Sequence, residues 1–160
     1  MKIIYESNTG HTQAYANMLA KNLNIQAISI KDYKVKKEEQ EPILFLGWVL
    51  ANQIQGYSKI KDNFPIIGIV AVGMNSPSQE NSKLLIETNQ IQKPFFYLQG
   101  GIDFNKLKGI KKLLLKLVAK AIKKENKPEN EEIIQVMETG GNFVKEENLK
   151  EILEYLTNQT

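Results

Sequence analysis

The sequence of 160 residues is most informative for what it lacks: it has no cysteine, no arginine, one histidine and one tryptophan. Without cysteine, disulfides, thiolate catalysis and cysteine-ligated metal sites are excluded. The single histidine, His11, excludes a histidine-rich metal site as well. Because all 21 basic residues are lysines, no guanidinium group is available to hold a phosphate through two parallel hydrogen bonds.

Long hydrophobic runs are also missing. No apolar stretch approaches the roughly 18 residues of a transmembrane helix, and Met1-Lys2 leads directly into a strand-like segment. We therefore expect neither a membrane span nor a signal peptide. The 42% of hydrophobic and 24% of charged residues are typical of a globular protein, and the length suits one domain over residues 1–160. The expected location is the cytoplasm.

Short apolar segments alternate with amphipathic segments through the first hundred residues. Continuous apolar runs are typical of strands buried on both faces of a parallel sheet, and their alternation with helices predicts βαβ units. The sequence thus predicts an α/β fold with helices on both faces of the sheet. The expected strands are Lys2–Glu6, Ile25–Ile30, Pro42–Gly47, Ile66–Val72 and Pro94–Leu98, and the expected helices are Thr12–Leu23, Gln53–Asp62 and Ser78–Thr88.

The pattern changes after Gly100-Gly101, where we expect a basic amphipathic insertion at about residues 101–143 of the same domain. A strongly periodic helix is predicted there, with its apolar stripe against the sheet. A charged loop, a short strand and a closing helix should follow it. These segments are Lys108–Lys124 (stripe Ile110, Leu114, Leu117, Val118 and Ala121), Glu125–Glu132, Ile133–Met137 and Lys145–Leu156.

In open parallel α/β sheets, ligands bind beyond the carboxyl ends of the strands. Here those ends are Ser7–Thr12, Gly47–Asn52, Gly73–Ser78 and Gln99–Asp103, and all are rich in Gly, Asn, Ser, Thr or Gln. None offers a Ser/His/Asp set or a pair of neighbouring carboxylates. This composition favours binding of a polar cofactor over acid–base catalysis by the protein itself.

The first of these loops, Ser7-Asn8-Thr9-Gly10-His11-Thr12, holds three hydroxyls, an amide and a glycine in six residues. A helix N-terminus has unpaired N–H groups and a partial positive charge, so it binds anions without needing lysine. The hydroxyls add donors, and Gly10 allows positive φ and a close backbone approach. The alternative interpretation, an ordinary helix cap, would use one or two of these groups.

Other nucleotide-binding patterns are absent. There is no GxxxxGK[ST] sequence and no GxGxxG after the first strand. Glu6-Ser7 and Leu46-Gly47 stand where a phospho-accepting receiver domain would carry aspartates.

The first loop resembles the (T/S)-x-T-G-x-T phosphate loop of the flavodoxin family. The resemblance implies a flavodoxin-like doubly wound five-stranded parallel sheet of order 2-1-3-4-5. It also implies FMN, with its phosphate in the first loop and its ring between the loops after the third and fourth strands. Trp48 would stack on the ring, unless it is a core or hinge aromatic. The cofactor-binding residues implied are Ser7, Asn8, Thr9, Gly10, His11, Thr12, Gly47, Trp48, Val49, Leu50, Ala51, Asn52, Gly73, Met74, Asn75 and Ser76.

The second half, "FFYLQGGIDFNKLKGIKKLLLKLV", looks like the flavodoxin-domain group that includes quinone-dependent protoporphyrinogen dehydrogenase. That resemblance implies an FMN-dependent oxidoreductase or electron carrier whose partner is a quinone or a redox protein. The residues leave enzyme and carrier open. A flavodoxin-fold interaction protein without flavin is the alternative function.

Charge is distributed unevenly. Lys106–Lys127 contains nine lysines and one acid, a net of +8, whereas the rest of the chain has 12 lysines and 17 acids, a net of −5. Two interpretations stay open: solvated lysines around a packed helix, or a surface for peripheral contact with an anionic membrane or an acidic redox partner. Nucleic acid is not expected, because arginine is missing and aromatic residues do not alternate with the lysines.

Overall fold

The computed structural model describes residues 1–33, 41–103, 109–125, 131, 134, 135, 137 and 140–158. Predictions for most of residues 125–132 and for Lys106, Lys108 and Lys127 lie outside these ranges. The elements in chain order are β1 (Lys2–Glu6), α1 (His11–Leu23), β2 (Ala27–Ser29), β3 (Ile43–Leu50), β4 (Gln53–Ile54), α2 (Tyr57–Ile60), β5 (Ile66–Gly73), α3 (Gln79–Asn89), β6 (Phe95–Gln99), β7 (Gly101–Ile102), α4 (Ile110–Glu125), β8 (Gly141–Asn142), the 3₁₀ helix η2 (Glu146–Leu149) and α6 (Lys150–Thr157).

The main sheet has the strand order β2-β1-β3-β5-β6, and all four neighbouring pairs in this order are parallel. Short β4 is added antiparallel to the end of β3. Apart from β4, this is the predicted order 2-1-3-4-5. The predicted doubly wound α/β fold is therefore confirmed.

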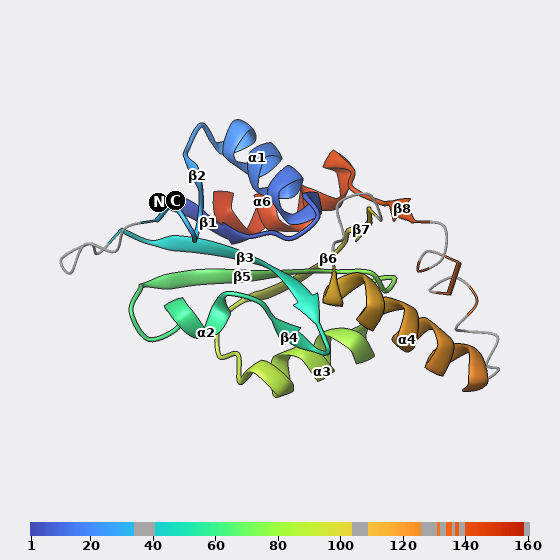
Figure 1. The fold of residues 1–160 in the computed structure, drawn as a ribbon. Helices are drawn as coiled ribbons and strands as arrows, with labels where there is room; N and C mark the ends of the chain where they lie inside the picture. The colour runs from blue at the N-terminus through green and yellow to red at the C-terminus, as the bar shows by residue number, and fades with distance from the viewer. Residues whose placement is uncertain are drawn as a thin grey trace.

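Side chains alternate between the two faces of the sheet, as the two-residue period of a strand requires. In β3, Leu44 and Leu46 join one core and Ile43 and Phe45 the other. Helices α1 and α6 cover the first face, while α2 and α3 cover the second (Figure 1). Burial on both faces explains why β3 and β5 have continuous apolar sequences.

We predicted that Gly47–Leu50 would be part of a loop, and this prediction is wrong. The segment forms the second half of β3. The chain reverses at Ala51 and Asn52, whose φ angles are 47° and 60°, and returns as β4. Two consecutive positive φ angles match the right-handed twist of a two-residue hairpin. Gly47 is required here, since a Cβ atom would lie 2.5 Å from Ile54 Cγ2 and 2.7 Å from Gln55 O.

The C-terminal part departs from two predictions. Ile134, Gln135 and Met137 are helical where a strand was expected. Helix α4 forms as predicted, but among its described side chains Ala119 is buried, whereas Leu117 of the predicted stripe is 56% exposed. Several faces of α4 are apolar in sequence, so periodicity alone could not select the packed one.

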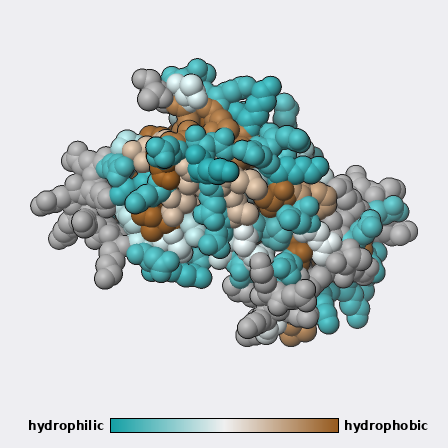
Figure 2. All heavy atoms as spheres, turned by 90° about the horizontal axis from the view of Figure 1, so that it is seen from above, coloured by the Kyte–Doolittle hydropathy of each residue, from teal (hydrophilic) through white to brown (hydrophobic). Residues whose placement is uncertain are grey.

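Strands β7 and β8 form a separate antiparallel pair next to the end of β6. Among the described residues, no helix is long and apolar enough to cross a membrane. Viewed from above the α1 and α6 face, hydrophilic side chains cover much of the surface, with smaller hydrophobic areas between them (Figure 2).

Candidate functional site

A cavity of about 290 Å³ opens at the carboxyl edge of the sheet. It lies where β1, β3 and β5 end and α1 begins, with α4 and Met137 on the opposite wall. This is the edge at which parallel α/β sheets bind ligands. The lining residues are Ser7, Asn8, Thr9, His11, Thr12, Trp48, Val49, Leu50, Ala51, Val72, Gly73, Met74, Gly101, Ile102, Val118 and Met137.

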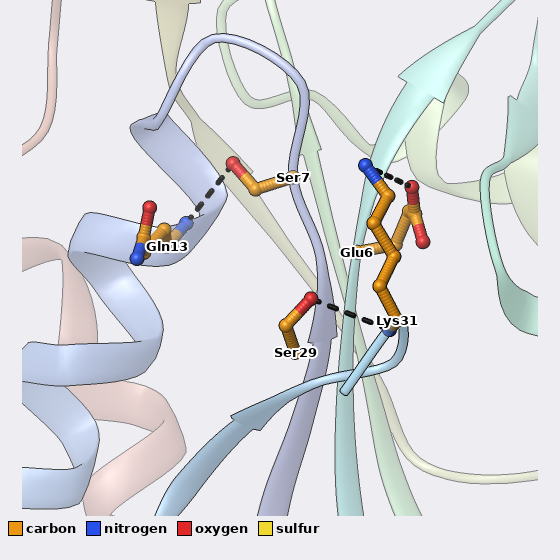
Figure 3. A network of polar contacts seen from close by, with 5 residues as sticks. All are labelled: Glu6, Ser7, Gln13, Ser29 and Lys31. Atoms are coloured by element: carbon orange, nitrogen blue, oxygen red, sulfur yellow. Dashed lines mark hydrogen bonds and ion pairs between the residues drawn. The ribbon is translucent and has the colours of Figure 1, made fainter. Parts of the chain in front are cut away.

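One end of the cavity is the turn from β1 into α1. The Gln13 backbone N–H donates to Ser7 Oγ at 3.3 Å (Figure 3), so Ser7 caps the third helical residue. Thr9 Oγ1 lies 3.0 Å from His11 Nδ1. Gly10 is the N-cap with φ 103°, and its position supplies no side-chain cap. The ordinary-cap interpretation accounts for Ser7, and a hydroxyl that accepts one bond can still donate its own proton.

The electrostatics of this end favour an anion. The first turn of α1 contains no acidic residue, so its partial positive charge is not neutralised there. Glu6, the nearest acid in sequence, points away from α1 toward Lys31, with Oε1 3.7 Å from Lys31 Nζ (Figure 3). A negative ligand group at the turn would therefore meet backbone dipoles and hydroxyls.

The remaining walls are apolar. The β3–β4 hairpin contributes Trp48, Val49 and Leu50. From the opposite side, Ile102 and Met137 form a small buried cluster with Ala119, against which Met74 and Ile122 also pack. A flat ligand between these walls would be held by dispersion and by exclusion of water.

Asn89 fixes the hairpin that carries Trp48. Its Oδ1 accepts from the Ile54 N–H at 2.9 Å, and its Nδ2 donates to Asn52 O and Leu85 O, both at 2.8 Å. Both the oxygen and the nitrogen of the Asn89 side chain are thereby bonded at a buried position. Because the bonds join α3 to Asn52 in the turn and to Ile54 in β4, Asn89 sets the position of one cavity wall.

Strand β6 holds the loop after β5. Tyr97 Oη donates to Asn75 O at 2.9 Å, and Gln99 Nε2 donates to Met74 O at 3.2 Å. Burial raises the pKa of Tyr97 above its ordinary value of 10.0, so its phenol is a proton donor at neutral pH. Gly73 leaves the space that the Tyr97 ring occupies.

Tyr15 of α1 connects the end of β6 with the chain that follows β8. Its hydroxyl donates toward Gln99 O at 2.7 Å and Phe143 O at 3.2 Å, and it accepts from Asn148 Nδ2 at 2.7 Å. Burial raises the pKa of Tyr15 above 10.0, the Asn148 bond opposing the shift. One side chain of α1 therefore ties both the end of β6 and the chain after β8 to the core.

A family model described as a flavodoxin domain matches residues 2–129. The chain belongs to the flavodoxin-domain family. The match covers the main sheet, the first turn and α4, which places the basic helix inside the matched region rather than beyond it. A search of the curated proteins found no match.

The structure brings together most of the cofactor-binding residues predicted for this flavodoxin domain. Those that line the cavity are Ser7, Asn8, Thr9, His11, Thr12, Trp48, Val49, Leu50, Ala51, Gly73 and Met74. Gly10, Gly47, Asn52, Asn75 and Ser76 lie outside the lining set. The backbone of Asn52 and Asn75 accepts bonds from Asn89 and Tyr97, so these two residues hold the walls.

Five lining residues were missed: Val72, Gly101, Ile102, Val118 and Met137. Val72 is a buried residue near the end of β5 and lies one position before the predicted loop, which begins at Gly73. Gly101 and Ile102 fell in the Gln99–Asp103 strand end, which was noted without being assigned to the site. Val118 and Met137 are apolar residues far along the chain, and nothing local in the sequence indicates that they turn toward the first loop.

Proposed function

We propose that this flavodoxin domain binds FMN in the cavity and works as a redox protein, either an electron carrier or an FMN-dependent oxidoreductase. The observation that carries the proposal is the division of the cavity. A hydroxyl-rich helix N-terminus lies at one end and apolar walls with the single tryptophan lie around the rest. FMN has the same division, with a phosphate at one end and a flat aromatic ring at the other.

The donor set at the polar end fits a phosphate. Ser7, Thr9 and Thr12 would hold it through their hydroxyls, together with backbone N–H groups at the start of α1. The absence of an acid in the first turn removes the repulsion that a dianionic phosphate would otherwise meet. Strong anion binding without cationic side chains depends on such fixed dipoles.

The apolar walls fit the ring. Trp48 would contribute aromatic contact, and Val49, Leu50 and Met74 would exclude water from around it. When bound, FMN supplies the transfer of one or two electrons, which no amino-acid side chain of this cavity can provide. The apolar surroundings disfavour the accumulation of charge in the site and so act on the redox potential.

The cavity offers little acid–base chemistry of its own. Among the described lining residues there is one histidine, His11, and no aspartate, glutamate, lysine or tyrosine, and the His11 Nδ1 lies 3.0 Å from Thr9 Oγ1. This supports a role for the chain in binding and orienting the cofactor.

The finer proposal concerns the reaction partner. The resemblance to the group that contains quinone-dependent protoporphyrinogen dehydrogenase suggests a flat, apolar quinone as electron acceptor. Ile102, Val118 and Met137 support it, because they give the cavity an apolar wall opposite the sheet. Multiple turnover with a quinone and a porphyrinogen would favour the enzyme, whereas one-electron exchange alone would favour the carrier.

The test of cofactor binding compares FMN with riboflavin, which lacks the phosphate. Both are titrated into the flavin-free protein by calorimetry. We expect FMN to bind far more tightly, since only FMN uses the turn between β1 and α1. Equal affinities would contradict the phosphate site. Failure of both to bind would favour the alternative of a flavodoxin-fold interaction protein.

A further inference from the structure

Helix α4 exposes leucine side chains together with lysines. Leu113 and Leu117 are 59% and 56% exposed, although Leu117 belongs to the predicted apolar stripe that was expected to pack against the sheet. Among the residues of α4 whose side chains the structure describes, Ala119 is buried and Ile122 is half-buried. Leu113 and Leu117 are left on the outer surface.

The exposed leucines and lysines share one face. Positions 113, 117, 120 and 124 follow the i, i+4, i+7, i+11 spacing of a single helix face. Leu113 and Leu117 stand at its N-terminal half, and the exposed Lys120 and Lys124 at its C-terminal half. Lys116 is exposed beside them. We call these five residues the α4 face.

The chemistry of α4 is unusually simple. From Ile110 to Lys124 the sequence contains only isoleucine, leucine, valine, alanine and lysine. This stretch therefore has no carboxylate to repel an anion and no hydroxyl, amide or guanidinium group for directional hydrogen bonds. Its first acid is the last residue, Glu125.

We propose that the α4 face docks the protein on an anionic lipid bilayer. Leu113 and Leu117 enter the boundary between headgroups and acyl chains, while Lys116, Lys120 and Lys124 lie among the phosphates. The binding of a helix to an anionic membrane surface grows with the apolar area that it buries and with the electrostatic attraction of its lysines to the lipid. The rest of the chain, with its net charge of −5 outside Lys106–Lys127, is repelled by the same surface, which orients the molecule.

An acidic protein is the competing partner, and the composition of α4 disfavours it. A specific protein interface combines buried anchors with directional hydrogen bonds, for which α4 offers only lysine ammonium groups. A lipid surface requires no fixed arrangement of partners. Exposed leucines beside lysines gain from both the acyl region and the headgroups, whereas a soluble acidic surface would leave Leu113 and Leu117 in water.

Docking on a bilayer would also set the orientation of the cavity. Val118 follows Leu117 in sequence and lines the cavity, so the docked helix holds one cavity wall near the lipid. Lipid binding itself does not depend on FMN. The test can therefore fail or succeed independently of the proposed cofactor.

The experiment is flotation of the full chain with vesicles of phosphatidylglycerol or of phosphatidylcholine, at low and at high salt. We expect binding to phosphatidylglycerol at low salt. High salt should weaken this binding, because salt screens the electrostatic attraction between the lysines and the lipid phosphates. A variant with Lys116→Glu, Lys120→Glu and Lys124→Glu should bind at least about 100-fold more weakly, since each lysine contributes roughly a fivefold factor near an anionic surface.

The matched control reverses the same number of lysine charges at positions outside α4. Lys21, Lys59 and Lys93 are exposed lysines away from α4, and replacing all three by glutamate gives the same net charge as the test variant. This control should keep most of its binding. Equal loss in both variants would show that only overall charge matters and would overturn the assignment to α4.

A second variant tests the leucines. Leu113→Gln with Leu117→Gln leaves the charge unchanged and alters only exposed side chains, so circular dichroism should stay native. We expect vesicle binding to weaken by tenfold or more. If this variant binds vesicles like the wild type, and polyglutamate binds as well as phosphatidylglycerol, an acidic protein is the partner and the lipid proposal is wrong. No vesicle binding at low salt would overturn it as well.

Discussion

The two walls of the cavity are built in different ways. The sheet wall rests on two large cores, which contain fully buried residues such as Tyr15, Leu46 and Phe45. Under α4, by contrast, the buried cluster in the described part of the chain consists of Ile102, Ala119 and Met137. Polar binding groups are thus fixed by a large core, while the buried cluster that supports the opposite apolar wall is small among the residues that the structure describes.

This difference teaches how one cavity can combine precision with adaptability. A phosphate site needs fixed dipoles, because its energy depends on distance and direction. An apolar wall needs only surface area, because the hydrophobic effect has no direction. The sheet wall suits the first requirement and the α4 wall the second.

The largest expected effect is in local stability. Amides in the centres of β3 and β5 should exchange with solvent only through global unfolding, whereas those of α4 should exchange through local opening. We expect the opening free energy of α4 to be lower by several kcal/mol, on a global scale of about 5–15 kcal/mol. Native-state hydrogen exchange measures both. Equal protection in the two regions would remove the contrast between the walls.

The same substitution in each region gives the next largest difference. Leu46→Ala in β3 empties a fully buried site and should lower the free energy of unfolding by roughly 2–5 kcal/mol. Leu117→Ala in α4 alters an exposed side chain and should change it by less than about 0.5 kcal/mol. Urea denaturation followed by circular dichroism compares them. A loss above 2 kcal/mol for Leu117→Ala would mean that α4 is packed more tightly than described.

Asn89→Leu tests how the hairpin is positioned. The variant keeps most of the volume but leaves the Ile54 N–H and the Asn52 and Leu85 carbonyls without their partner. We expect a loss of about 2 kcal/mol and a change in Trp48 emission, because the hairpin carries that residue. The control is Asn63→Leu at an exposed position, which should leave both readings near those of the wild type.

The smallest expected effect on stability concerns the ion pairs of Glu41 at the start of β1. The Lys2 ammonium and the Met1 amine, both 2.9 Å from Glu41 carboxylate oxygens, lower the pKa of Glu41 below its ordinary 4.5. Because the folded pKa is the lower one, the ion pair stabilises the fold above about pH 4.5 and is lost as pH falls further. Glu41→Gln should thus be slightly less stable than the wild type at pH 7 and equal to it near pH 2. If the stability difference between Glu41→Gln and the wild type grew as the pH fell, the ion pair would not be the cause of it.

The sheet wall was predictable from sequence and the α4 wall was not, for physical reasons. Continuous apolar runs such as Ile43–Leu46 indicate the buried strands, and the high density of hydroxyl side chains indicates the binding turn after the first strand. The two-residue reversal at Ala51-Asn52 lacks the usual glycine of such a turn, so β3 was ended too early. Which face of α4 packs is decided by partners such as Ile102 and Met137, whose proximity depends on tertiary structure.

The central claim is that the polar end of the cavity binds the phosphate and the apolar walls bind the flavin ring. The most direct measurement is the affinity of FMN and of riboflavin for the wild type, Thr9→Val and Trp48→Ala. Thr9→Val removes a hydroxyl while keeping the shape of the side chain. It should lower the affinity for FMN roughly tenfold, the scale of a hydrogen bond to a charged group, and leave the affinity for riboflavin unchanged. Trp48→Ala should lower the affinity for FMN and the affinity for riboflavin by the same factor, about fivefold or more. If Thr9→Val weakens both flavins equally, or Trp48→Ala weakens neither, the account is contradicted.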